Sequence, residues 1–130
     1  MIKALKVVMI VFGVIMILLG LLDIFMHDLV AQMYGFGEVA SYVNWMGEII
    51  GAMVIAVGVW SIVAGRDPLR HIYWVKFVIT MLLLAVVVSA HSILVGYVDF
   101  SQIGRAFIFY CIFAVAFLVL YPWRAASSSD

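Results

Sequence analysis

The sequence predicts an all-α integral membrane protein, a single four-helix bundle. Hydrophobic residues make up 68% of the 130 residues and charged residues only 11%, whereas a soluble domain is about half apolar and a quarter charged. A soluble domain of this length could not keep so much apolar surface away from water. The long apolar runs, such as residues 81–88, lack the alternation that strands of a membrane barrel require. The membrane segments are therefore expected to be helices.

Four windows reach about the 20 apolar residues that a helix needs to cross the hydrocarbon core. They cover residues 7–26, 43–64, 72–98 and 104–121. Two lysines before the first window resemble the start of a secretory signal. The apolar run that follows is long for such a signal and no small-residue cleavage site comes after it, so we expect a membrane helix. One domain is thus predicted over residues 1–124, with a polar tail at 125–130.

Three connections join these windows. Residues 27–42 are the longest connection and are partly apolar, which predicts a short helix or turn along the membrane surface. Residues 65–71 form a tight turn, in which Gly65 suits a helix C-terminus and Pro68 suits the start of the next helix. Residues 99–103 make the third connection. Successive helices are therefore predicted to run antiparallel, up-down-up-down.

The distribution of lysine and arginine predicts the orientation, because cytoplasmic loops are enriched in both. On one predicted side of the membrane, which holds the first and third connections, Arg105 is the only lysine or arginine. The N-terminus, the second connection and the C-terminus are therefore expected in the cytoplasm. The basic residues on that side are Lys3, Lys6, Arg66, Arg70, Arg124 and, just inside the third helix, Lys76.

Small residues indicate where the helices contact one another, because membrane helices associate by close packing over small side chains. Gly47 and Gly51 form a G-x-x-x-G pattern in the second window. Rows of such small residues are expected to hold the four helices together, and the alternative is that one row forms the contact of a homodimer. The predicted packing residues are Gly13, Gly20, Gly47, Gly51, Gly58, Ala85, Ser89, Ser92 and Gly96.

Ionisable side chains inside the spans are functional-site candidates, because they are costly at membrane depth. Asp23, Glu48 and His91 are expected to share the outer half of the bilayer, since the helices alternate in direction. The alternative is that these polar groups form interhelical hydrogen bonds and one ion pair that fix the bundle. The predicted ligand pocket comprises Asp23, His27, Asn44, Glu48, His91, Arg105 and Tyr110.

Several other activities find little support in the sequence. Asp23, His27, Glu48 and His91 carry oxygen and nitrogen ligands suited to zinc, copper or iron, but they form no close metal-binding motif, and no two histidines are matched in depth for haem. No catalytic or nucleotide-binding motif is present, so an enzyme is not expected. A formal net charge of zero gives no field for nucleic acid. The single cysteine, Cys111, excludes an intramolecular disulfide.

Two segments resemble a known family. The first window ends in residues 20–25 with the sequence GLLDIF, and the second contains residues 47–51 with the sequence GEIIG. Over about residues 5–122 the chain is similar to the DoxX-like group of small four-helix bacterial membrane proteins. The glutamate followed by glycine, at Glu48 and Gly51, is the most specific part. The chain has Asp23 and His27 where such proteins often carry a basic residue.

The resemblance implies a bacterial-type cytoplasmic (inner) membrane and an association with membrane redox chemistry. The family takes its name from a subunit of a thiosulfate:quinone oxidoreductase, and Glu48 would match a functional glutamate. The leading hypothesis is an accessory subunit of a homo-oligomer or larger membrane complex, with an outward-facing pocket for a quinone head group, a lipid or another small ligand. The alternatives are a small homodimeric transporter coupled to protons or cations, and a structural subunit without a ligand.

Overall fold

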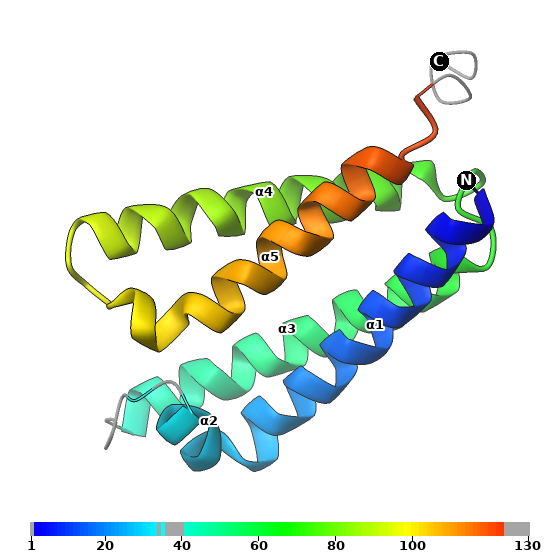
Figure 1. Cartoon of the computed structure of the whole chain (residues 1–130). Coiled ribbons are helices and arrows are strands. Elements are labelled where there is room, and N and C mark those ends of the chain that lie inside the picture. The colour runs from blue at the N-terminus through cyan, green and yellow to red at the C-terminus, as the bar shows by residue number, and fades with distance from the viewer. Residues whose placement is uncertain (1, 34, 36–40, 124–130) are drawn as a thin grey trace.

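The computed structural model is helical throughout its regular structure and describes residues 2–33, 35 and 41–123. Within these residues the helices are α1 (Ile2–Phe25), α2 (His27–Met33), α3 (Ser41–Gly65), α4 (Ile72–Leu94) and α5 (Phe100–Leu120) (Figure 1). Four of them are long and apolar enough to cross a membrane, namely α1, residues Trp45–Gly65 of α3, α4 and α5. The prediction of an all-α bundle of four apolar helices is confirmed.

Two of the predicted helix starts are wrong by several residues. The first helix begins at Ile2, not at residue 7, because the lysines that precede the apolar run are themselves good helix formers. The last begins at Phe100, not at residue 104. Here the backbone N–H of Asp99 donates to Oε1 of Gln102 at 2.9 Å, and this side chain to backbone bond is part of the capping-box pattern that starts a helix.

The predicted end of the third long helix is also wrong, because α4 stops at Leu94 and not at residue 98. Gly96 has a φ of +83° and donates its N–H to the carbonyl of Ile93, while the N–H of Tyr97 donates to the carbonyl of Ser92. This pair of bonds is the Schellman motif, which closes a helix on a left-handed glycine. Gly96 therefore ends α4 and does not pack within it.

Glycines bring α1 and α3 into close backbone contact. A Cβ atom added to Gly13 would lie 2.6 Å from the carbonyl oxygen of Gly58, and one added to Gly20 would lie 2.5 Å from that of Gly51. The reciprocal additions would lie 2.6 and 2.8 Å from the opposing oxygens. The earlier glycine of α1 opposes the later glycine of α3, so the two helices run in opposite directions at this contact. Only glycine permits this approach of two backbones, and we call these four residues the glycine seam.

The seam repeats every seven residues, and Gly47, which was expected to pack between helices, does not belong to it. Gly51, Gly58 and Gly65 follow the repeat along α3, and Gly65 lies against Met9. A seven-residue repeat keeps one face of a long helix against its neighbour. Gly47 lies one turn before Gly51, at the level where α1 ends at Phe25. A Cβ atom at Gly47 would meet nothing within 4 Å among the described residues, and the same holds for Gly96.

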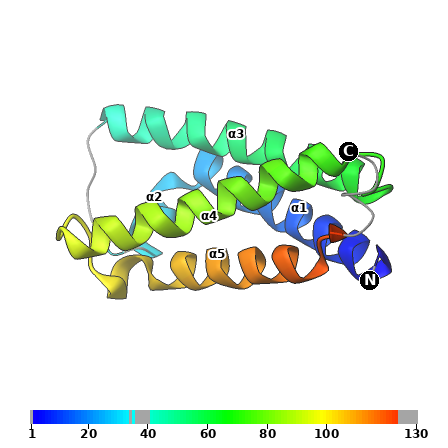
Figure 2. The same cartoon turned by 90° about the horizontal axis from the view of Figure 1, so that it is seen from above.

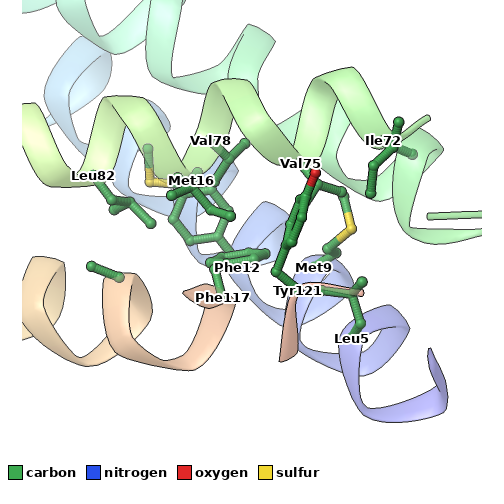
Figure 3. Packing of buried hydrophobic residues seen from close by; sticks show 13 residues of the cluster. Leu5, Met9, Phe12, Met16, Ile72, Val75, Val78, Leu82, Phe117 and Tyr121 are labelled. Carbon is green, nitrogen blue, oxygen red and sulfur yellow. The ribbon is translucent and has the colours of Figure 1, made fainter. Parts of the chain in front are cut away.

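A hydrophobic core fills one end of the bundle. The N-terminal part of α1, the α3–α4 connection and the end of α5 lie together at this end, which we call the core end, and α2 and the α4–α5 connection lie at the other, the α2 end (Figures 1 and 2). Phe12 and Phe117 meet between the helices, with their ring centroids 5.5 Å apart (Figure 3). The core combines α1, α4 and α5, and its fully buried side chains include Leu5, Met9, Phe12, Val75, Val78 and Phe117.

The α2 end is packed less tightly than the core end. On α4 no residue beyond Leu82 is buried, and the predicted packing residues Ala85, Ser89 and Ser92 are half-buried there. At the core end, by contrast, even the polar Ser61 is fully buried, and its hydroxyl accepts a hydrogen bond from Nε1 of Trp74 at 3.0 Å. The bundle is therefore closed at one end and looser at the other.

The seam predicts that Gly58→Ala destabilises the protein. The added methyl group would meet the backbone of α1, and overpacking of this kind costs about 1–3 kcal/mol. Thermal unfolding in detergent would measure the change. Gly47→Ala is the matched control on the same helix, where the methyl group has open space, and it should unfold at or above the wild-type temperature. Equal unfolding temperatures for Gly58→Ala and wild type would contradict the seam.

Candidate functional site

A cavity of about 390 Å³ lies between α1, α3 and α5 toward the α2 end. Its volume is within the range of small-molecule sites. Val30 of α2 and the first turns of α5 contribute to its rim. The walls are mainly apolar and are formed by Ile15, Met16, Leu19, Leu22, Ile50, Val54, Ala106 and Phe109.

The structure brings three of the predicted pocket residues into this cavity, namely Asp23, Arg105 and Tyr110. Asp23 is half-buried on α1. The glycine seam holds it there, since a Cβ atom on Gly51 would lie only 2.9 Å from the Cβ atom of Asp23. Arg105 projects from the second turn of α5. The cavity thus carries opposite charges contributed by two different helices.

Asp23 and Arg105 line the same cavity without pairing. In the described part of the chain neither forms an ion pair or a hydrogen bond, with the other or with a third residue. Asp23 is half-buried, so its carboxylate is costly without a partner, whereas Arg105 lines the cavity with an exposed side chain. Both groups are consequently available to a ligand, the carboxylate as an acceptor and the guanidinium as a forked donor.

Glu48 and His91 do not enter this cavity, which corrects the expectation of one shared pocket. Both side chains are exposed and neither lines the cavity. The ring of His91 packs edge-on to that of Tyr97, with their centroids 6.4 Å apart. Because α4 contributes no residue to the cavity wall, a residue on α4 cannot reach the site even at the same depth.

Two other predicted residues cannot be placed in the site. His27 begins α2 and Asn44 lies in the first turns of α3, but their side chains lie outside what the structure describes. The described members of the candidate metal set therefore do not share one site, because Asp23 lines the cavity while Glu48 and His91 do not. Among the described residues no group of three His, Cys, Asp or Glu side chains is placed to hold a metal ion.

Sequence reasoning missed Ser101 and Gln102, which also line the cavity. Oε1 of Gln102 caps α5 by accepting the Asp99 N–H, and its Nε2 donates to the carbonyl of Gly35 at 3.5 Å. Gly35 follows α2 with a φ of +71°. Gln102 therefore links the turn after α2 to the start of α5. The D-x-x-Q spacing from Asp99 was the available signal, since a cap at Asp99 places Gln102 in the first turn.

An aromatic cluster closes the cavity toward the core end. Phe109 lines the cavity and packs on Phe113 at 4.8 Å between ring centroids. Phe113 in turn packs on the buried Phe12 at 5.3 Å. Aromatic pairs at these separations are favourable and tightly packed. Phe109 therefore connects the wall of the cavity to the aromatic part of the core.

The comparisons with known proteins gave no relative. No family model matches the chain. No curated protein and no solved structure is significantly similar to it. The resemblance to the DoxX-like group therefore stays a prediction from the sequence.

The absence of a pair between Asp23 and Arg105 predicts that their contributions to stability are additive. A double-mutant cycle with Asp23→Asn and Arg105→Gln, measured by unfolding in detergent, should give an interaction energy within about 0.5 kcal/mol of zero. Residues that contact each other show coupling of about 0.5–3 kcal/mol. Stronger coupling, with each single variant destabilised, would instead favour the alternative that these polar groups hold the helices together.

Proposed function

We propose that the chain is a multi-pass protein of a bacterial-type cytoplasmic membrane that binds the polar end of a membrane-soluble amphiphile in the cavity between α1, α3 and α5. In this proposal the helices run antiparallel, up-down-up-down, with both termini in the cytoplasm. The basic residues Lys3, Lys6, Arg66 and Arg70 at the core end support this orientation, because cytoplasmic segments are rich in lysine and arginine. The cavity then opens toward the outer side.

The observation that carries the proposal is the presence of Asp23 and Arg105, without partners in the described chain, on the walls of a mainly apolar cavity. Ionisable groups at membrane depth are expensive and usually mark a site. The apolar walls suit the tail of an amphiphile, and the charged groups suit its polar end. A binding site accounts for both features together.

The proposed role is that of an accessory subunit in a homo-oligomer or larger membrane complex. Exposed Glu48, within the apolar span Trp45–Gly65, supports a protein partner, since a charge facing lipid is costly. The resemblance to the DoxX-like group supports a link to quinone chemistry, in which Arg105 and Gln102 would donate to quinone carbonyls. Since Phe109, Phe113 and Phe12 pack together between the cavity and the core end, this half of the bundle favours a binding site over a pathway for protons or cations.

The proposed orientation predicts which turns react with a membrane-impermeant maleimide. In a Cys111→Ala background, Tyr97→Cys should be labelled in intact cells, because Tyr97 lies in the exposed α4–α5 connection. Leu69→Cys, in the exposed α3–α4 connection, should react only after the membrane is permeabilised. Labelling of Leu69→Cys alone in intact cells would reverse the orientation and turn the cavity toward the cytoplasm.

The binding proposal predicts that filling the cavity removes an amphiphile that co-purifies with the protein. Ala106→Phe places a ring in the cavity, whereas Ile108→Phe adds a ring to the exposed face of the same helix and is the control. Solvent extracts of the purified proteins would be compared with the whole membrane extract by mass spectrometry. We expect one amphiphile to be enriched in wild type and in Ile108→Phe, and at least about tenfold depleted in Ala106→Phe. Identical extracts from all three proteins would refute a ligand in this cavity.

A further inference from the structure

We infer that the ligand of the cavity is a zwitterionic amphiphile of the phosphoethanolamine kind, with its ammonium group against Asp23 and its phosphate against Arg105. This inference rests on the proposed function and specifies the chemistry of the head group. It starts from the arrangement of two opposite charges that line one cavity without forming an ion pair in the described chain.

A ligand with only one kind of polar group would leave part of this site unsatisfied. A quinone offers carbonyl acceptors to Arg105 but no donor or cation to Asp23. A simple anion would pair with Arg105 and be repelled by Asp23. Because a polar group left unpaired in apolar surroundings costs binding free energy, the complementary ligand carries both a cation and an anion.

The Arg105 side of the cavity suits a phosphate group. A guanidinium binds phosphate through two parallel hydrogen bonds. Ser101 and Gln102, in the first turn of α5, line the same part of the cavity and add a hydroxyl and an amide that can donate. Their position near the helix N-terminus further favours negative charge. These features supplement Arg105, which provides the formal positive charge.

The Asp23 side suits a primary ammonium group. A carboxylate accepts hydrogen bonds only, and a primary ammonium supplies three donors together with the opposite charge. Ile15, Leu19 and Leu22 come from the same helix as Asp23 and line the cavity beside it. These side chains give an acyl chain a surface to cover, so a phospholipid should bind more tightly than the free head group.

The test is a titration of the full-length protein in detergent, followed by native mass spectrometry. The probes are dihexanoyl phosphatidylethanolamine, the corresponding phosphatidylglycerol, and soluble phosphoethanolamine. We expect wild type to bind phosphatidylethanolamine about tenfold more tightly than phosphatidylglycerol, the effect of one charge-assisted hydrogen bond. This comparison uses wild-type protein and does not depend on any variant folding.

Three substitutions assign the contacts. Asp23→Asn should weaken the binding of phosphatidylethanolamine about tenfold and should strengthen that of the anionic phosphatidylglycerol, which Asp23 repels, whereas Arg105→Gln should weaken both. Glu48→Gln is the matched control. Glu48 is a carboxylate on the neighbouring helix that lies outside the cavity, so its substitution should change neither affinity.

The outcomes separate this inference from the proposed function. If the two phospholipids bind equally and Ala106→Phe blocks both, the inference of a zwitterionic ligand is wrong, and the proposal that the cavity is a binding site is retained. If neither phospholipid nor free phosphoethanolamine binds, the inference of a zwitterionic ligand is wrong. An unrelated amphiphile in the extracts would then still support the cavity as a binding site. If phosphoethanolamine binds as tightly as the phospholipid and depends on both Asp23 and Arg105, the head-group contacts are supported and the source is a soluble zwitterion.

Discussion

The backbone contact between α1 and α3 is the constraint on which the rest of the structure depends. At Gly13 and Gly58, and again at Gly20 and Gly51, the two helices approach so closely that no Cβ atom fits between them. In lipid, where burial from water cannot hold helices together, such close packing is a main source of association. The seam also fixes the rotation of α1 and α3 about their axes, and therefore which side chains face α5.

Large side chains then decide where the bundle closes. Phe12, Phe113 and Phe117 fill the space between α1, α4 and α5 at the core end. Toward the α2 end, α1, α3 and α5 enclose a cavity that their apolar side chains and the polar Asp23, Ser101 and Arg105 line without filling it. One fold thus combines a tightly packed, aromatic-filled half with a half that has room for a ligand, and Asp23 and Arg105 lie in the second half.

The sequence could predict the depth of the polar residues but not the direction in which they point. Hydropathy identified four apolar helices, and alternating direction placed Asp23 and Glu48 at one level. Asp23 follows Gly20 by three residues and Glu48 precedes Gly51 by three, so each lies about 60° from the seam. Because residue numbers run oppositely along the two helices, these equal offsets point to opposite sides of the α1–α3 pair. Without knowing which glycines form the seam, the side of each helix that faces α5 could not be predicted.

The same geometry explains why one carboxylate has a cavity and the other does not. The seam that directs Asp23 toward α5, together with Ile50 and Val54 of α3, directs Glu48 away from the bundle. Glu48 lies within an apolar span, where the hydrocarbon core offers no partner for a charge. A single copy of the chain gives Asp23 a cavity in which a ligand can pair with it, and gives Glu48 none. The cavity accounts for Asp23, and a second protein surface against α3 would account for Glu48, which is why a binding site and an assembly role belong to the same proposal.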